Sequence, residues 1–271
     1  MLVFVPTPIG NLGDISFRTI EVLKDGELIL CEDTRVTKKL LNLISIKHNI
    51  TFPNFEFISL HSHNEKDFLT QQNLKILESK NTIYMSDAGM PCVSDPGSYL
   101  VDFCIKNDIK FDILPGANAI LTAYASSGFD DTTFTFFGFL PHKGKDRQDK
   151  LDKVLNSDHL AILYESPHRL MKLINEINNI DKSRELFIVK ELTKKYQTKY
   201  KGSASDILKI LNGVDIKGEW VVIIKAKELE NKGIITLEDI QDLSLPPKQK
   251  AKLISKLTGQ NIKEIYSTII G

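Results

Sequence analysis

The sequence predicts an α/β fold of two domains with a small helical appendage at the C-terminal end. Short apolar runs alternate with helical patterns up to residue 225, and this alternation is typical of mostly parallel sheets covered by helices. A change of pattern near residues 115–120 indicates a boundary between two such domains. The chain has 271 residues, of which 42% are hydrophobic and 26% are charged, so its composition excludes a largely disordered protein.

The first domain is predicted over residues 1–116, because five short apolar runs there are each bounded by polar or turn residues. Strands are expected at residues 2–7, 27–32, 56–60, 82–86 and 111–114. Helices are expected between them, at residues 16–24, 35–43, 65–79 and 98–106. Asp14 and Thr34 are the expected caps of the first two helices, since short polar side chains favour that position.

The second domain is predicted over residues 117–228. Strands are expected at residues 133–137, 159–165, 185–190 and 220–225, and helices at residues 144–155, 168–178 and 203–211. Residues 115–130 carry small side chains on every side, which is typical of a helix packed closely at a domain junction.

The C-terminal stretch differs in pattern from both domains. The segment KELENKG after Ala226 indicates a linker, and residues 235–271 are predicted to form a small helical unit. Two short helices are expected there, separated by Thr258-Gly259-Gln260. Residues 246–271 contain five Lys and one Glu, so this unit is locally basic although the chain has a formal net charge of zero. Any phosphate-binding surface must therefore be a local patch.

Cysteine spacing and hydropathy exclude several classes of protein. Cys31, Cys92 and Cys104 form no C-x-x-C pair, so buried, reduced thiols in a cytoplasmic protein are expected rather than disulfides or a zinc site. His61-Ser62-His63 is too weak a pattern to predict a metal site. The N-terminal residues lack a basic segment before their apolar run, and no stretch reaches about 18 apolar residues. Neither a signal peptide nor a transmembrane helix is expected.

Three loops at predicted strand ends are rich in glycine and proline. They span residues 7–14, 86–97 and 115–119, and the second of them holds two Gly, two Pro and two Asp. Such loops expose backbone N–H and C=O groups while fixing their own shape. Ligands of α/β proteins bind at the carboxyl ends of strands, so these loops are the predicted ligand site. The dinucleotide fingerprint G-x-G-x-x-G is absent, because the first loop has only Gly10 and Gly13.

Three charged residues, Glu32, Asp33 and Arg35, follow the second predicted strand. One interpretation is structural: Asp33 or Thr34 caps the next helix, and Arg35 pairs locally. The other is catalytic: Glu32 or Asp33 accepts the proton of a substrate hydroxyl, and Arg35 holds a neighbouring phosphate. Both interpretations remain open at the level of sequence.

Two basic stretches outside the C-terminal unit are candidate RNA contacts. Residues 190–201 interleave Lys with Tyr, a pattern that fits either a solvated face or an RNA-contacting strip, because phosphates attract Lys and bases stack on aromatic rings. Lys143, Lys145 and Arg147 form the other stretch. Such dispersed patches suit a large, shaped RNA better than a short linear one.

Several long motifs, in this order along the chain, resemble the ribosomal RNA small-subunit methyltransferase I family, whose members are ribose 2′-O-methyltransferases of the tetrapyrrole-methylase (class III methyltransferase) fold. The matching segments are PTPIGNLGD (6–14), CEDTR (31–35), SDAGMPCVSDPG (86–97), PGANA (115–119), FFGFLP (136–141), YESPHR (164–169), KELTK (190–194) and GEW (218–220). Met90 is a small departure, since the family usually has Thr at that position.

The resemblance implies a homodimer and a cleft between the two α/β domains that binds S-adenosyl-L-methionine. It also implies methylation of a cytidine 2′-hydroxyl in the decoding region of 16S rRNA, in the small ribosomal subunit. The cofactor contacts that it implies in the first domain and at the junction are Pro8, Asp87, Ala88, Gly89, Val93, Asn118 and Ala119. Glu165 and Leu192 would close the pocket from the second domain.

Three other functions are weaker alternatives. A tetrapyrrole methylase of the precorrin type has the same fold, but such enzymes usually carry a GxGPG-type first loop and a GGDP-type third loop, where this chain has PIGNLG and DAGMP. A nicotinamide-dependent oxidoreductase would need the missing G-x-G-x-x-G. A non-catalytic RNA-binding protein would use the C-terminal helices, but it would not need the three strand-end loops.

Overall fold

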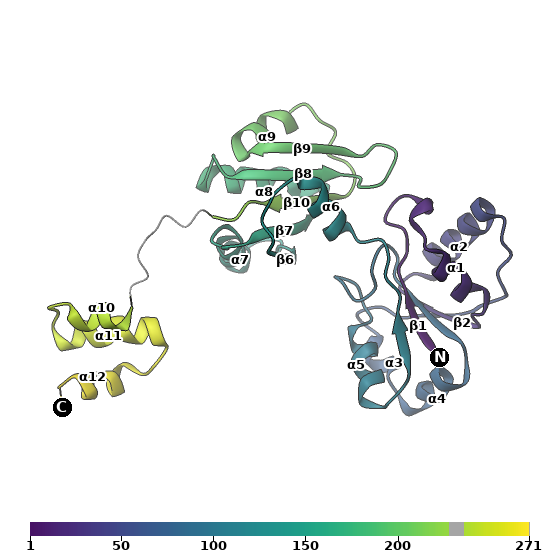
Figure 1. The fold of residues 1–271 in the computed structure, drawn as a ribbon, viewed down its shortest axis with the longest axis horizontal. Helices are drawn as coiled ribbons and strands as arrows, with labels where there is room; N and C mark the ends of the chain where they lie inside the picture. Colours follow the sequence, from purple (N-terminus) through teal and green to yellow (C-terminus); the bar gives the residue numbers. More distant parts are fainter. Residues whose placement is uncertain (228–235, 271) are drawn as a thin grey trace. The chain divides into compact units, whose positions relative to one another are not determined.

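The computed structural model describes residues 1–227 and 236–270 of the chain. The chain divides into two compact units, residues 1–227 and 228–271. Apart from its first residue, the predicted linker lies outside the described residues, as do the predicted boundaries at residues 228 and 235. The first unit contains two five-stranded β-sheets, which follow one another along the chain (Figure 1).

The first sheet is parallel, with the strand order β3-β2-β4-β1-β5. Its strands are β1 (Leu2–Val5), β2 (Leu28–Cys31), β3 (Glu56–Ser59), β4 (Thr82–Met85) and β5 (Phe111–Ile113). The inner strands β2, β4 and β1 are buried at every residue, because helices cover both faces of a parallel sheet. This explains why the sequences of these strands are nearly continuous apolar runs.

Helices pack on both faces of this sheet. They are η1 (Leu12–Asp14), α1 (Phe17–Lys24), α2 (Thr34–His48), α3 (Glu65–Phe68), α4 (Gln71–Ser79) and α5 (Ser98–Lys106). Leu2 and Phe4 of β1 belong to an apolar cluster that also contains side chains of α4 and α5. Val3 and Val5 point to the opposite face, where their cluster contains side chains of α1 and α2.

Helix starts differ from the sequence-based expectation in three places. Ser16 rather than Asp14 caps α1, and Asp33 rather than Thr34 caps α2. In both cases the capping side chain belongs to the residue directly before the first helical one. The helix expected over residues 65–79 is divided into α3 and α4, because the hydroxyl of Thr70 caps a new helix at that point.

The second sheet is mixed, with the strand order β6-β7-β10-β8-β9. Its strands are β6 (Phe134–Phe139), β7 (Leu160–Glu165), β8 (Glu185–Lys190), β9 (Thr198–Ser203) and β10 (Trp220–Ile224). β10 runs antiparallel to both of its neighbours, β7 and β8. The sequence did not predict β9, because this edge strand reads TKYKGS and lacks an apolar run.

The two faces of the second sheet have different partners. Its helices are α6 (Ala119–Ser127), α7 (Lys145–Leu155), α8 (Pro167–Ile180) and α9 (Ala204–Leu211). Side chains of α7, α8 and α9 share one apolar cluster with the sheet. α6 packs on the other face through Ile120 and Ala123, and Ile9 and Val93 of the first domain pack against the same cluster. The small-residue helix at the domain junction is thereby confirmed.

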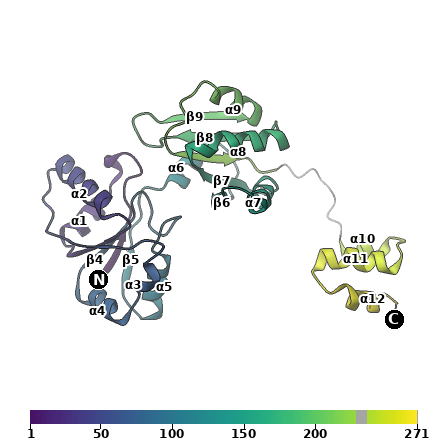
Figure 2. The same cartoon turned by 180° about the vertical axis from the view of Figure 1, so that it is seen from behind.

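Over residues 236–270, the C-terminal unit is a three-helix cluster rather than the expected pair of helices. It contains α10 (Leu237–Asp242), α11 (Pro247–Thr258) and α12 (Ile262–Ile270), with α10 and α11 side by side (Figures 1 and 2). Ile240, Ala251, Ile254 and Ile265 form its small core.

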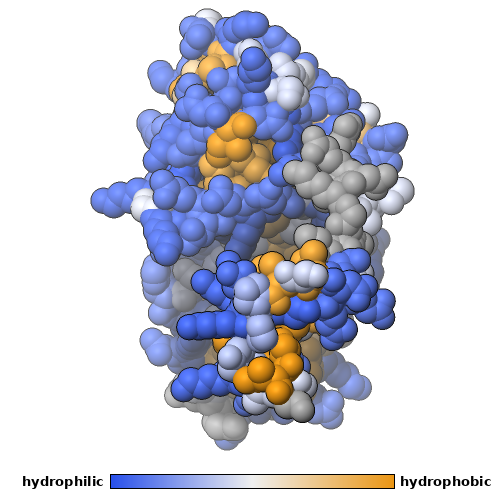
Figure 3. Space-filling view, turned by 90° about the vertical axis from the view of Figure 1, so that its left-hand side faces the viewer, coloured by the Kyte–Doolittle hydropathy of each residue, from blue (hydrophilic) through white to orange (hydrophobic). Residues whose placement is uncertain are grey.

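Figure 3 shows apolar side chains gathered in patches on a largely hydrophilic surface. Over residues 1–227 and 236–270, no helix has the length and apolar character needed to cross a membrane.

Candidate functional site

Three loops leave the same edge of the first sheet. β1 lies between β4 and β5, so the loops that follow these three parallel strands begin side by side. Thr7 and Gly89 join the first loop to the second through two backbone hydrogen bonds of 3.0 Å each. The hydroxyl of Ser86 donates to the carbonyl oxygen of Gly89 at 2.8 Å. The first two of these loops therefore hold each other in place.

Gly89 has a backbone conformation that few other residues adopt. Its φ is +88°, and a Cβ atom at this position would lie 3.2 Å from Cγ2 of Ile9. A side chain here would be strained by the backbone and crowded by the first loop.

The second sheet brings three further segments to one edge. β10 begins at Trp220 and runs antiparallel to its neighbours, so Trp220 pairs in register with Glu165 on one side and with Lys190 on the other. The start of β10 consequently lies beside the ends of β7 and β8. The segments that meet there are residues 165–167, 191–195 and 218–221.

A cavity of about 340 Å³ is lined by segments from both domains. Its lining residues are Ile9, Ala88, Ala119, Phe139, Tyr164, Glu165, Ser166, Pro167, Leu192, Gly218, Glu219, Trp220 and Val221. A second cavity of about 60 Å³ shares four of these residues and is also lined by Gly89, Met90, Val93, Asp95 and Asn118. Pockets that bind small organic ligands measure about 300–1,000 Å³, so the larger cavity has the size of a ligand site.

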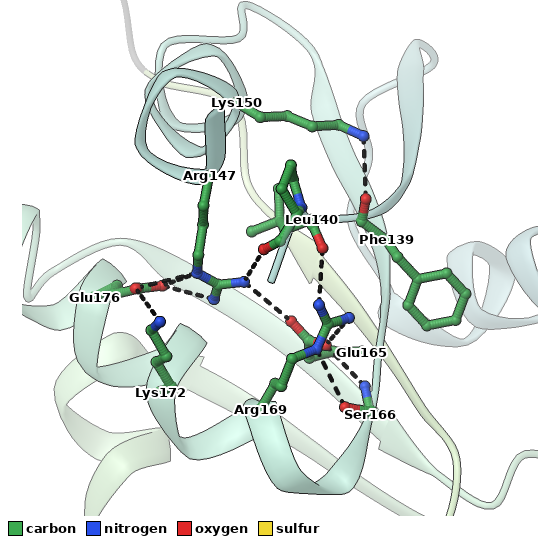
Figure 4. A network of polar contacts seen from close by, with 10 residues as sticks. Phe139, Leu140, Arg147, Lys150, Glu165, Ser166, Arg169, Lys172 and Glu176 are labelled. Atoms are coloured by element: carbon green, nitrogen blue, oxygen red, sulfur yellow. Dashed lines mark hydrogen bonds and ion pairs between the residues drawn. The ribbon is translucent and has the colours of Figure 1, made fainter. Parts of the chain in front are cut away.

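Glu165 is a buried carboxylate in the wall of the larger cavity, with 2% of its surface exposed. Figure 4 shows the polar contacts that surround it. Its Oε1 accepts a hydrogen bond from the backbone N–H of Ser166 at 2.8 Å and pairs with Nη2 of Arg169 at 2.7 Å. Its Oε2 lies 3.9 Å from Nη1 of Arg147 and has no hydrogen-bond partner among the described residues. A buried oxygen of this kind can accept a hydrogen bond from a ligand.

Both guanidinium groups around Glu165 are fixed by other partners. Arg147 pairs with Glu176 at 2.7 Å and donates to the carbonyl oxygen of Pro141 at 3.0 Å. Arg169 donates to the carbonyl oxygen of Leu140 at 2.8 Å. Arg147 is only 2% exposed, so the expectation that it belongs to an RNA-contacting stretch is wrong: its charge is paired with Glu176 and lies beside Glu165.

Comparison with known proteins places the chain in a family. The family model for tetrapyrrole (corrin/porphyrin) methylases matches residues 1–208. A curated relative from Campylobacter fetus, named ribosomal RNA small subunit methyltransferase I, is 51% identical over the full length of both chains. A relative of the same name from Helicobacter pylori is 45% identical and covers 98% of this chain and 96% of its own.

The chain belongs to the tetrapyrrole methylase family, in its ribosomal RNA small subunit methyltransferase I group. Solved structures agree with the predicted tetrapyrrole-methylase fold. A diphthine synthase matches with a TM-score of 0.61 at 15% identity, covering 83% of this chain and 90% of its own. A uroporphyrin-III C-methyltransferase from Thermus thermophilus, complexed with S-adenosyl homocysteine, matches with a TM-score of 0.55 at 11% identity, covering 82% of this chain and 96% of its own.

In this tetrapyrrole methylase, most of the residues that were predicted to bind the cofactor are found in the walls of the two cavities. Ala88, Ala119, Glu165 and Leu192 line the larger cavity. The smaller cavity is lined by Gly89, Val93 and Asn118, together with Ala88 and Ala119. Pro8 and Asp87 lie in the same loops but line neither cavity.

Other lining residues of the methylase were not predicted individually. Tyr164 and Trp220 lie within the family motifs YESPHR and GEW, and Asp95 lies within SDAGMPCVSDPG. These motifs were the signal that could have identified them. Burial raises the pKa of the Tyr164 hydroxyl to about 12, so this phenol is neutral at physiological pH.

Asp33 and Arg35, two of the three predicted catalytic residues, pair with each other. Nε and Nη2 of Arg35 donate to the two carboxylate oxygens of Asp33 at 3.1 Å and 2.7 Å, and the backbone N–H of Arg35 donates to Oδ1 of Asp33 at 2.8 Å. The side-chain hydrogen bonds from Arg35 lower the pKa of Asp33 to about 2. These contacts fit the structural interpretation, in which Asp33 caps α2.

The other acidic groups at this edge have raised pKa values. Burial raises the pKa of Glu32, and the charge of Asp87 adds to the rise. Burial also raises the pKa of Asp87, whose Oδ1 accepts the backbone N–H of Asp33 at 3.4 Å. Burial, followed by the charges of Glu32 and Asp87, raises the pKa of Asp95 to about 7. Of these three carboxyl groups, that of Asp95 belongs to a residue that lines a cavity.

Proposed function

We propose that this chain catalyses the transfer of a methyl group from S-adenosyl-L-methionine to a cytidine 2′-hydroxyl of 16S rRNA in the small ribosomal subunit. The observation that carries this proposal is the ligand-sized cavity lined from both domains, in a chain that is 51% identical to a relative named ribosomal RNA small subunit methyltransferase I.

The residues around the cavity fit such a cofactor. Apolar side chains such as Ile9, Phe139 and Leu192 suit an adenine ring. Oε2 of Glu165 accepts no hydrogen bond from the described residues and is the proposed acceptor for one from the cofactor. The proposed cofactor-binding residues are Pro8, Asp87, Ala88, Gly89, Val93, Asn118, Ala119, Glu165 and Leu192. S-adenosyl-L-methionine supplies an electrophilic methyl group on its sulfonium when it is bound. The chain must then orient the acceptor and exclude water, and good orientation alone accounts for much of the rate of such reactions.

The acceptor hydroxyl is a weak acid, so a neighbouring base helps to remove its proton. Asp95 is the proposed base, because it lines the smaller cavity and its pKa of about 7 lets it gain and lose a proton near neutral pH. Glu32 acts in this proposal through its charge, which contributes to the raised pKa of Asp95.

Arg35 is the proposed contact for a phosphate beside the target nucleotide. Its side chain is 88% exposed, and Asp33 holds its guanidinium through two of the N–H groups. Replacing Arg35 by Ala is expected to raise KM for the small subunit and to leave the affinity for the cofactor unchanged. A raised cofactor Kd with an unchanged KM for the subunit would contradict this role.

The experiment that tests the function combines an activity assay with a map of ribose methylation. The purified protein is incubated with tritiated S-adenosyl-L-methionine and small subunits from cells that lack the protein. We expect label in 16S rRNA at one cytidine ribose, and light scattering is expected to give the mass of a homodimer. Label on a tetrapyrrole substrate but not on the subunit would instead assign the precorrin-type alternative.

A further inference from the structure

A lysine-lined groove lies next to the cavity. It has a volume of about 520 Å³ and is lined by residues 10–12 of the first loop, by Lys47 in the last turn of α2 and by residues 193–195 after β8. The groove is therefore formed, like the cavity, by segments from both domains.

The groove and the cavity share two of their walls. Ile9 and Leu192 line the cavity, and the residues that follow them in the chain, Gly10 and Thr193, line the groove. The two loops touch there, since the backbone N–H of Asn11 donates to Oγ1 of Thr193 at 3.2 Å. A Cβ atom on Gly10 would lie 2.9 Å from the carbonyl oxygen of Leu192, so this close approach requires glycine.

Two lysines of the groove have free ammonium groups. Lys194 is neutralised by Glu191 and Glu219, each at 3.0 Å. Lys47 and Lys195 form no ion pair or hydrogen bond through their ammonium groups with any residue that the structure describes. The groove thus presents two uncompensated positive charges beside the proposed methyl-transfer site.

An exposed aromatic ring accompanies these charges. Tyr196 is 73% exposed, and Nζ of Lys195 lies 5.4 Å from the centroid of its ring. Other lysines of the basic stretch are engaged within the chain: Lys199 donates to the hydroxyl of Ser126 and Lys201 to the carbonyl oxygen of Gly128. The part of this stretch that is free for a partner is therefore the loop at residues 195–196.

We infer that this groove binds backbone phosphates of the RNA substrate, with Lys47 and Lys195 as the phosphate contacts and Tyr196 as a platform for a neighbouring base. The inference rests on the proposed function. Free ammonium groups beside an exposed aromatic ring are the combination that single-stranded RNA recognition uses. In a chain of zero formal net charge, electrostatic attraction for RNA must come from such local patches.

The test measures binding of protein-free 16S rRNA to the full chain as a function of salt. The variants are Lys47→Ala, Lys195→Ala and the double variant, with Lys47→Arg and Lys195→Arg as conservative forms. Lys110→Ala is the matched control, because Lys110 is exposed and directly precedes β5. It therefore lies at the amino ends of the strands of the first sheet, whereas the first loop follows the carboxyl end of β1. Each Lys→Ala change is expected to lower the slope of log K against log salt by about 1. The Arg forms and the control should keep the wild-type slope.

The outcomes separate the inference from the function on which it rests. Cofactor affinity, measured by calorimetry, should be unchanged in all variants, because these lysines line the groove and not the cavity. A double variant with the wild-type salt slope would overturn the inference. So would weaker binding to intact small subunits with unchanged binding to protein-free 16S rRNA, because the groove would then contact a protein. If the proposed function itself fails, the wild type transfers no tritiated methyl group to 16S rRNA, an outcome that is read independently of the salt slope for binding.

Discussion

The carboxyl group of Asp95 is held where its ionisation depends on two neighbouring charges. Burial raises its pKa, and Glu32 and Asp87 raise it further, to about 7. If Asp95 accepts the hydroxyl proton, the rate of methylation should rise with pH and level off above about 7. Asp95→Asn should lower the rate by about 10²–10⁴-fold, the usual contribution of a general base. Single-turnover rates across the neutral range measure both effects.

Two variants sharpen this prediction. Glu32→Gln should move the midpoint of the pH profile to lower pH, because it removes a negative charge that raises the pKa of Asp95. Asp102→Asn is the control, since Asp102 is an exposed residue of α5 whose one ion-pair partner among the described residues is Lys106. A pH profile of Asp95→Asn that matches the wild type would show that Asp95 is not the base. Orientation of the acceptor hydroxyl would then account for the rate.

The same carboxyl group makes stability depend on pH. The folded chain holds the pKa of Asp95 near 7, above the ordinary value of 3.8. Between these values the folded chain binds a proton that the unfolded chain does not, so the free energy of unfolding falls as pH rises. The stabilisation from this group is complete below 3.8 and is lost as pH passes through about 7. Urea unfolding should show this fall in the wild type, and a smaller fall in Asp95→Asn.

Gly89 allows a second prediction at the scale of one residue. Gly89→Val should abolish cofactor binding, because the side chain would press on Ile9 beside the cavity. Backbone strain alone should cost about 1–3 kcal/mol. Gly144→Val is a control for a side chain at positive φ, since Gly144 has a φ of +85° and no atom of the described residues lies within 4 Å of a Cβ built there. Unchanged cofactor affinity in folded Gly89→Val would refute the placement of the ligand.

At the scale of elements, the ion pairs around Glu165 tie the end of β6 to β7, α7 and α8. Arg169→Met should destabilise the fold by about 3–5 kcal/mol, because it removes one partner of a buried pair. The exposed pair of Arg18 and Asp112 offers a control, and Arg18→Met should cost about 0–1 kcal/mol. Urea unfolding measures both changes, and equal losses would show that the buried network has no special role.

Strands with an apolar run could be predicted from the sequence, including the edge strands β3, β5 and β6, whereas elements without such a run could not. The inner strands of the parallel sheet are apolar runs, so their positions followed from hydropathy. The sequence of β9, TKYKGS, is mostly polar and has no apolar run. α10 has six residues, which is too short for a clear helical pattern. The break between α3 and α4 depends on one hydroxyl, that of Thr70, within a stretch whose apolar spacing fits a single helix.

The site shows a similar limit. The loops of the first domain could be predicted, because parallel strands bring their carboxyl ends to one edge. Tyr164 and Trp220 could not be placed together by pattern alone, because their meeting depends on the antiparallel direction of β10. The raised pKa of Asp95 could not be predicted from the sequence either, because it results from burial and from the charges of Glu32 and Asp87.

At the scale of the whole molecule, the lining of the cavity ends at Val221, and residues 228–271 form a separate compact unit. A chain that ends at Lys227 should therefore bind S-adenosyl-L-methionine with unchanged affinity. It should methylate the small subunit more slowly, because the five lysines after residue 246 would be lost as RNA contacts. Calorimetry and subunit assays test this. Loss of cofactor binding by a well-folded truncated chain would contradict it.

The order of strands in the first sheet also has a consequence for synthesis on the ribosome. β1 pairs with β4 and β5, and Leu2 stands opposite Thr82 in the register. Translation proceeds at about 5–20 residues per second, so about 4–16 s separate the synthesis of these two partners. Throughout that interval the apolar segment Leu2–Val5 has neither of its neighbouring strands. A nascent chain of this protein should therefore be a substrate for chaperones that bind short apolar segments, until β4 leaves the exit tunnel.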